Sequence, residues 1–279
     1  MIEGRRSATA ERVAMRRAAH QLYDQPLIFE DPLALKILSD EAATRVRNPT
    51  EEEQTPFAQG FRAYMATRSR FAEEELAHSV GHGIRQYIVL GAGLDTFAYR
   101  NPFRELRVFE VDHPATQAWK RERLHHADIA IPDSMRFAPV DFERDTLEHG
   151  LEAAGLQRDQ PAFFSWLGVV PYLTRTAAFA TLNFIAGLPQ GSGVVFDYSI
   201  PREMMNENER RAFDALAERV ARAGEPFRLF FDPDQLTADL HGLGFTQVED
   251  QTTPAIRARW LGQEPPAHGR SGRILCARV

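Results

Sequence analysis

The amino-acid sequence predicts an α/β fold built on a doubly wound, mostly parallel β-sheet. Three observations support this prediction. Short apolar runs recur through residues 86–198, stretches of helical character separate them, and the first run passes directly into the turn Gly91-Ala92-Gly93. A buried strand that ends in a tight glycine turn is typical of parallel sheets that bind a ligand at their strand ends.

Helices are expected before the first strand, across residues 1–85. The dipeptide Asp31-Pro32 predicts a helix start, because aspartate can cap a helix and proline suits its first turn. We therefore expect a helix over 32–38. A longer helix is expected over 57–79, and the glycines just beyond it end that helix.

The alternating part follows in order along the chain. Its predicted strands are 86–90, 106–111, 135–139, 162–169 and 193–198, and its predicted helices are 114–125, 143–154 and 174–185. After it we expect a charged helix over 201–223, a short helix over 234–241, and a terminal pair of antiparallel strands over 245–249 and 274–279. Neither a repeat nor a linker interrupts the sequence, which predicts one domain over 1–279.

Charge and hydropathy argue against several classes of partner. The formal net charge is -6 and the pI is about 5.9, whereas proteins that bind nucleic acids carry a basic excess. No run approaches the ~20 apolar residues that span a bilayer, and the single cysteine, Cys276, allows no disulfide within the chain. We expect a soluble, cytoplasmic protein without a nucleic-acid or membrane partner, and the sequence leaves its oligomeric state open.

Residues at three strand ends predict a nucleoside ligand. Glycine lets the backbone of 91–93 approach a ligand closely, although Gly-x-Gly by itself also fits a plain tight turn. Asp112 ends the second strand, where an acidic side chain can accept both ribose hydroxyls, and Glu110 on the same side of that strand offers the same chemistry. After the third strand, Asp141 can accept from an adenine amino group while Phe142 covers the ring.

Four segments carry a more specific pattern. They are Phe29-Glu30-Asp31-Pro32-Leu33-Ala34, Thr67-Arg68-Ser69-Arg70-Phe71, Val89 to Arg100 (VLGAGLDTFAYR) and Phe109-Glu110-Val111-Asp112-His113-Pro114. Together they resemble the leucine carboxyl methyltransferase family, and most closely its bacterial branch of S-adenosylmethionine-dependent O-methyltransferases that act on small molecules. The resemblance runs from about residue 7 to the C-terminus. It implies a class I, Rossmann-like methyltransferase fold that uses S-adenosylmethionine and releases S-adenosylhomocysteine.

The resemblance also implies roles for single residues. Arg68 would bind the methionine carboxylate of the cofactor, Gly91, Ala92 and Gly93 would pass beneath its methionine and ribose, Asp112 would hold the ribose, and Asp141 with Phe142 the adenine. The implied organisation is an N-terminal helical cap (1–85), a cofactor-binding sheet (86–198), a lid insertion (199–231) and a C-terminal helix with strands (232–279). The cap and the lid would cover the acceptor site.

One position departs from the family pattern. The family's fourth strand usually carries a glutamate before a glycine and a Tyr-Leu pair, whereas this chain has Leu167 before Gly168. The cofactor can still touch the backbone at Leu167, but a side-chain contact is lost. This departure weakens the expectation that the acceptor is a protein C-terminal leucine, the substrate of the eukaryotic members, and favours a small-molecule acceptor.

The expected reaction is methyl transfer to an oxygen of a small molecule, most plausibly a carboxylate. In-line transfer requires the acceptor oxygen to lie against the methyl carbon with water excluded, and a carboxylate is already ionised and needs no general base. For a hydroxyl acceptor the candidates for the base are Tyr172, Asp197 and Tyr198, each of which local hydrogen bonding explains equally well. No metal is expected, because a helix-breaking glycine separates His78 from His82.

Two other functions stay open on the sequence alone. A protein that kept the cofactor pocket as a binding or regulatory module is compatible with Leu167 at the glutamate position. An NAD(P)-dependent oxidoreductase is compatible with the topology, but the turn lacks the third glycine of the dinucleotide fingerprint and the Asp141-Phe142 pair counts against it.

Overall fold

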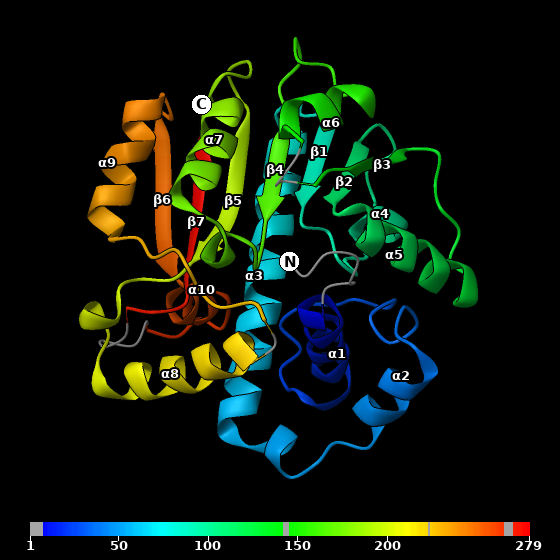
Figure 1. Ribbon diagram of the computed structural model, residues 1–279, viewed down its shortest axis with the longest axis vertical. Helices are drawn as coiled ribbons and strands as arrows, with labels where there is room; N and C mark the ends of the chain where they lie inside the picture. The colour runs from blue at the N-terminus through cyan, green and yellow to red at the C-terminus, as the bar shows by residue number, and fades with distance from the viewer. Residues whose placement is uncertain (1–7, 142–144, 223, 265–269) are drawn as a thin grey trace.

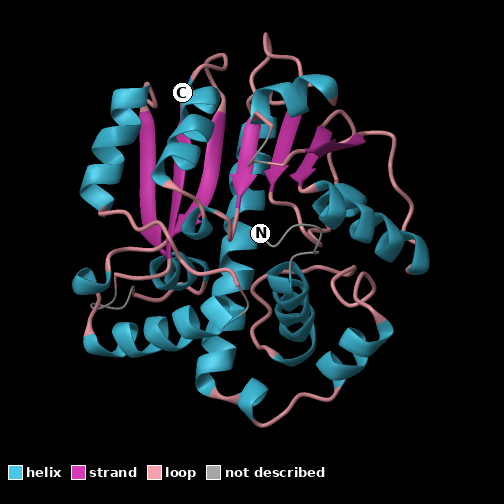
Figure 2. Cartoon of the chain, viewed as in Figure 1, coloured by secondary structure: helices cyan, strands magenta, loops and turns pink. Residues whose placement is uncertain are grey.

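The computed structural model contains a seven-stranded mixed sheet between two layers of helices (Figure 1, Figure 2). It describes residues 8–141, 145–222, 224–264 and 270–279. The strand order is β3-β2-β1-β4-β5-β7-β6; the first five strands are parallel, and β7 is antiparallel to both of its neighbours. The chain order reverses on the two sides of β1, which confirms the doubly wound sheet and its antiparallel ending.

Every predicted strand is present, with ends that shift by at most a few residues. The strands are β1 (Gln86–Leu90), β2 (Arg107–Asp112), β3 (Met135–Pro139), β4 (Phe163–Trp166), β5 (Gly193–Tyr198), β6 (Gln247–Thr252) and β7 (Arg273–Arg278). The apolar character of β1 follows from burial on both faces: Ile88 and Leu90 belong to one core cluster, and Tyr87 and Val89 to another.

The helices form the two outer layers and a roof over one end of the sheet. They are α1 (Ala8–Tyr23), α2 (Asp40–Arg47), α3 (Pro56–Gly81), α4 (Phe97–Arg100), α5 (Pro114–His126), α6 (Leu147–Ala153), α7 (Arg175–Ala186), α8 (Glu207–Arg222), α9 (Pro233–Leu243) and α10 (Thr253–Trp260). Side chains of α3, α4 and α10 pack on one face of the sheet, and those of α6, α7 and α9 pack on the other. In the described part of the chain, no helix combines the length and apolarity needed to cross a bilayer.

The roof lies beyond the carboxyl ends of the parallel strands. Figure 1 shows α1, α2, α8 and one half of α3 below the arrowheads of β1, β2 and β4. A third core cluster joins α1 and α2 to α5, with Ala14, Ala18, Ile37 and Trp119 among its members. Any cavity at these strand ends is therefore enclosed by elements from both the N-terminal and the later parts of the chain.

The predicted helix over 32–38 is wrong. Residues 32–37 form successive turns, and the helix of this region is α2, which begins after its cap Ser39. Asp31 accepts the amide hydrogen of Leu33, as a cap would, but Arg17 and Thr96 from other elements also hold its buried carboxylate. These tertiary contacts keep the chain in turns where local capping predicted a helix.

Helix α10 was not predicted, although its local signals are present. It lies in the connection between the two terminal strands, with Pro254 in its first turn and with Thr252 accepting the amide hydrogen of Ala255. Proline is tolerated in a first turn because that N–H has no partner within the helix. The fully buried Ile256 anchors the helix against the sheet.

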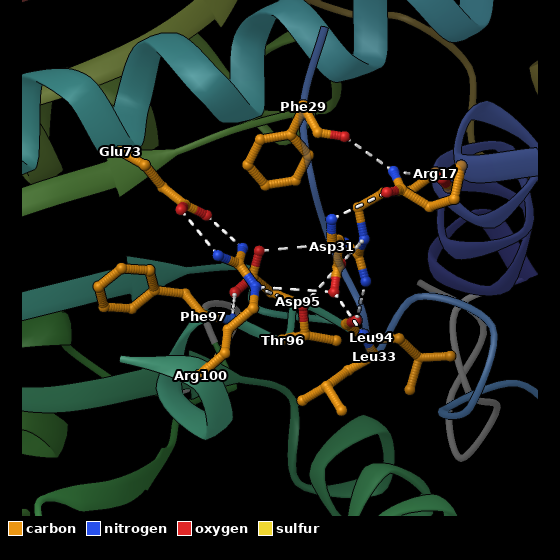
Figure 3. Close-up of polar contacts among 11 residues, drawn as sticks. Arg17, Phe29, Asp31, Leu33, Glu73, Leu94, Asp95, Thr96, Phe97 and Arg100 are labelled. Atoms are coloured by element: carbon orange, nitrogen blue, oxygen red, sulfur yellow. Dashed lines mark hydrogen bonds and ion pairs between the residues drawn. The ribbon is translucent and has the colours of Figure 1, made fainter. Parts of the chain in front are cut away.

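A buried ion pair ties α1 to the segment after β1 (Figure 3). The side chain of Asp31, which is 1% exposed, lies 2.7 Å from Arg17 Nε and accepts the Thr96 hydroxyl hydrogen at 2.7 Å. The Arg17 contact lacks the alignment of a hydrogen bond, so its contribution is electrostatic. A second guanidinium nitrogen of Arg17 donates to the Leu94 carbonyl at 2.6 Å.

We expect Asp31→Asn to lower the free energy of unfolding by about 3 to 5 kcal/mol, because it leaves the buried Arg17 with only the more distant carboxylate of Asp95, at 4.0 Å, as counter-charge. Denaturant unfolding followed by circular dichroism measures the change. The control is Glu207→Gln, which breaks the exposed Glu207–Arg211 pair on α8 and is expected to cost at most ~0.5 kcal/mol. Equal effects of the two substitutions would contradict the assignment.

Candidate functional site

The principal cavity of the structure lies at the carboxyl ends of β1, β2 and β4. Its volume of about 830 Å³ is in the range of cofactor and small-molecule sites. We call it the main cavity. Its walls are α1, α3, the turn 91–95, the ends of β2 and β3, the segment 167–174 and the segment 224–228.

The glycine turn after β1 forms the floor of the main cavity. Gly91 and Gly93 have φ angles of +66° and +46°, which lie in the left-handed region that favours glycine. A Cβ at Gly91 would lie 2.4 Å from Val169, and a Cβ at Gly93 would lie 3.1 Å from Ala10. The turn is thus packed between the segment after β4 and α1. Gly91, Ala92 and Gly93 all line the cavity, as the prediction of a close backbone approach requires.

Asp112 also lines the main cavity, at the end of β2. One carboxylate oxygen accepts the amide hydrogen of Gly93 at 2.7 Å, and the other accepts that of His113 at 2.7 Å. Burial raises the pKa of Asp112 in spite of these two hydrogen bonds. Each oxygen keeps a second lone-pair site, so the carboxylate can accept two further hydroxyl hydrogens.

Glu110, the alternative to Asp112, lies outside the main cavity. It is 1% exposed, and one of its carboxylate oxygens is 2.6 Å from Lys120 Nζ and also accepts from the hydroxyl of Tyr99. Burial raises the pKa of Glu110 to about 7, against the opposing effect of Lys120. Its role in this structure is therefore internal, and of the two residues only Asp112 can meet a ligand.

Asp141 lines the same cavity just beyond β3. Its carboxylate lies 3.9 Å from the His113 ring, which in turn caps α5 by accepting the amide hydrogen of Ala115. Phe142, the other half of the predicted adenine site, lies outside the described residues. Leu167, at the position of the family's glutamate, supplies an apolar part of the cavity wall.

Arg68 projects from α3 into the cavity wall and is 5% exposed. Its guanidinium donates a hydrogen bond to the carboxylate of Asp197 at 2.8 Å. The Cβ that Gly168 lacks would lie 2.8 Å from this guanidinium, so glycine there is what admits Arg68. Tyr64 also donates to Asp197, at 2.5 Å, and the Gly168 amide donates to its other oxygen. Asp197 therefore positions Arg68.

Sequence reasoning missed five charged residues in the wall of the main cavity: Arg17, Glu73, Asp95, Glu225 and Arg228. Glu73 forms a two-point ion pair with Arg100, and burial raises the pKa of its carboxyl group. Asp95 accepts the amide hydrogen of Phe97 and so shapes the turn. Two of these residues carried a signal in the sequence. Asp95 lies within VLGAGLDTFAYR, and Glu73 lies just over one helical turn after Arg68.

A second cavity of about 220 Å³ adjoins the first. The two share Thr9, Val13, Arg68, Gly168 and Tyr172, which we call the junction. Asp197 and Tyr198 line the second cavity. Burial raises the pKa of Tyr172 to about 12, and burial together with the Asp250 carboxylate raises that of Tyr198. Both hydroxyls therefore stay protonated at neutral pH.

A metal ion is not required by this arrangement. In the described ranges of the chain, His, Cys, Asp and Glu side chains form no group of three or more that could hold one. The rings of His78 and His82 are tilted against each other with centroids 4.3 Å apart near the end of α3, and neither residue lines the main cavity. What the site offers is two connected cavities, which suits the transfer of a group between two bound molecules.

Comparison with known proteins agrees with this geometry. The family model of leucine carboxyl methyltransferase matches residues 10–186. A Bacillus subtilis (strain 168) protein named for S-adenosyl-L-methionine-dependent methyltransferase activity, YktD, is 32% identical in an alignment 272 positions long that covers 89% of each chain. A Mycobacterium avium (strain 104) protein named for the same activity is 31% identical in an alignment 285 positions long that covers 96% of this chain and 84% of its own.

Solved structures show the same fold. A Thermobifida fusca protein crystallised as a candidate methyltransferase superposes with a TM-score of 0.60 at 14% identity, and the match covers 99% of this chain and 96% of that one. A Streptomyces avermitilis protein of the duf574 family superposes with a TM-score of 0.56 at 15% identity over 96% of each chain.

Proposed function

Because the chain belongs to the leucine carboxyl methyltransferase family and is an S-adenosylmethionine-dependent methyltransferase, we propose that its acceptor is a carboxylate of a small molecule. One observation carries this proposal. The wall of the second cavity, as far as the structure describes it, holds no carboxylate or imidazole that is free of hydrogen bonds and so poised to remove a proton. A carboxylate acceptor needs no such group, whereas an alcohol or phenol does.

The ionisable groups of that wall are all engaged. Asp197 accepts hydrogen bonds from Tyr64, Arg68 and the Gly168 amide. Glu209 is buried in part, but hydrogen bonds from Ser271 and from its own helix start outweigh that burial and lower its pKa. A carboxylate whose negative charge is already stabilised by several hydrogen-bond donors is a poor proton acceptor. Tyr172, Asp197 and Tyr198 are thus better explained as shaping the acceptor site.

The residues of the main cavity fit the cofactor. The Asp112 carboxylate has lone pairs for two ribose hydroxyls, the positive-φ glycines bring backbone close, and Arg68 offers a cation for the methionine carboxylate. Bound there, S-adenosylmethionine supplies a methyl group on a positively charged sulfur. Val140 and Asp141 line the same cavity just beyond β3, and they are the residues we propose for the adenine.

The chain's own contribution to the reaction is orientation and exclusion of water. Thr9 on α1 donates to Glu225, so the start of α1 is joined to the segment that follows α8. The amide of Arg228 donates to the Pro171 carbonyl at 2.7 Å, which holds that segment across the strand ends. These contacts close the junction between the cavities, where the acceptor oxygen must meet the methyl carbon.

We expect Asp112→Asn to weaken S-adenosylhomocysteine binding by about 1.5 to 3 kcal/mol, because hydrogen bonds from the ribose to a charged acceptor are lost. Isothermal titration calorimetry measures the dissociation constant. Asp133→Asn removes the same charge at an exposed position and serves as the control. An affinity that Asp112→Asn leaves unchanged would show that the ribose is held elsewhere.

Arg68→Ala is expected to weaken S-adenosylhomocysteine binding by a similar amount, about 1.5 to 3 kcal/mol, through loss of the contact with the methionine carboxylate. The matched control is Arg70→Ala on the same helix, since Arg70 pairs with the exposed Glu74 and does not line either cavity. Thermal unfolding of each variant separates lost binding from lost structure. If both variants bind alike, the methionine carboxylate lies at another residue.

The acceptor chemistry is tested by the alkali lability of the product. The protein is incubated with methyl-labelled S-adenosylmethionine and a panel of small carboxylic acids and phenols, and the products are treated with base. We expect volatile labelled methanol, because methyl esters hydrolyse in alkali whereas methyl ethers do not. A base-stable labelled product would make the acceptor a hydroxyl. Tight cofactor binding without transfer to any compound would favour a binding module.

A further inference from the structure

The second cavity has two kinds of wall. One is aromatic and apolar and includes Phe61, Tyr64, Phe213 and Phe227. The other is cationic, with guanidinium groups from Arg12 and Arg16 on α1 and from Arg219 on α8. This cluster of positive charge is unexpected in a chain whose net charge is -6. An apolar cavity with a cationic wall is suited to an apolar molecule that carries a negative charge.

Arg16 is the least compensated of these cations. It is half-buried, its guanidinium carbon lies 4.6 Å from the centroid of the Phe61 ring, and in the described part of the chain no carboxylate forms an ion pair with it. Burial, together with the neighbouring charges of Arg219 and Arg12, lowers the pKa of Arg16 to about 10. A cation–π contact offsets only a small part of such a cost. An anion bound beside Arg16 would remove it.

Of the other charged groups of the cavity, Arg12 is exposed to water and the rest have partners. Arg68 pairs with Asp197, and Arg219 pairs with Glu52 at 2.9 Å on the surface. The carboxylates of Asp197 and Glu209, the two acidic side chains in this wall, accept hydrogen bonds from other groups. Neither is therefore a partner for Arg16.

Arg16 is not one of the residues of the junction, where we place methyl transfer. Thr9 and Val13 line both cavities, whereas Arg16 lines only the second. Because an α-helix rises about 1.5 Å per residue, the backbone of Arg16 is roughly 4.5 Å further along α1 than that of Val13. An anion held at Arg16 can therefore be a different group from an acceptor carboxylate at the junction. A reacting carboxylate clamped by an unpaired guanidinium would also be a weaker nucleophile.

We propose that the acceptor is an apolar dicarboxylate, with one carboxylate at the junction and the other bound by Arg16. The apolar body between them lies against the aromatic wall. This inference rests on the proposed function, and it adds that one end of the molecule is recognised while the other end is methylated. The volume of about 220 Å³ limits this body to a short chain.

The test compares two probes that have the same chain length and differ in one carboxylate, suberate and octanoate. Their dissociation constants are measured by calorimetry on the full chain loaded with S-adenosylhomocysteine. We expect suberate to bind about tenfold or more tighter than octanoate, and Arg16→Gln to remove most of that difference, as a lost charged hydrogen bond would. Suberate binding no tighter than octanoate in the unmodified protein overturns the proposal, and so does an equal loss of both affinities in Arg16→Gln.

Two further variants complete the test. Arg211→Gln removes the same charge on the exposed side of α8, where Arg211 pairs with Glu207, and should leave both affinities unchanged. Arg16→Lys should retain part of the preference for suberate, because it keeps a cation but not the planar fork of donors. The readout is binding and needs no turnover. Failure of the labelled-methyl experiment with a clear suberate preference would therefore reject the proposed function alone, whereas transfer to carboxylates without that preference would reject this inference alone.

Discussion

The rest of the structure depends on the interactions of one buried carboxylate, that of Asp31. A charge removed from water must be met by opposite charge and by hydrogen-bond donors, and here these come from Arg17 on α1 and from Thr96 before α4. The same Arg17 holds the Leu94 carbonyl within the glycine-turn segment. Asp31 thus holds α1 against the segment after β1, and both of these line the main cavity.

A second buried ion pair organises the other side. Arg68 and Asp197 bring α3 to the end of β5, and Gly168 after β4 leaves the space that the guanidinium fills. Arg68 lies at the junction of the two cavities and Asp197 lines the second, so the pair joins the proposed cofactor site to the proposed acceptor site. Because Asp197 is committed to this pair, we propose that the reaction proceeds without it as a base. That restriction favours an acceptor that is already ionised.

The two cavities divide the chemistry between different parts of the chain. The main cavity is built largely from the ends of parallel strands, whose carboxyl ends meet at one edge of any doubly wound sheet. The second cavity is built from α1, α3 and α8, which lie beyond that edge (Figure 1). A family can therefore keep its cofactor site while the roof helices change the acceptor. In this chain these helices hold Arg16 as a half-buried cation beside the ring of Phe61.

The sequence by itself determined the sheet and the family, because strand periodicity, tight turns and the motifs around Arg68, Gly91 and Asp112 are local in the chain. Only the tertiary structure decided which acidic residue of β2 faces the cavity, that 32–37 form turns, and what Asp197 does. Arg68 and Asp197 are 129 positions apart, and the partner that satisfies a buried charge is chosen by packing rather than by neighbouring residues. The cationic wall of the second cavity also depends on tertiary structure. Arg16 and Arg219 come together only when α1 and α8 are folded over the sheet.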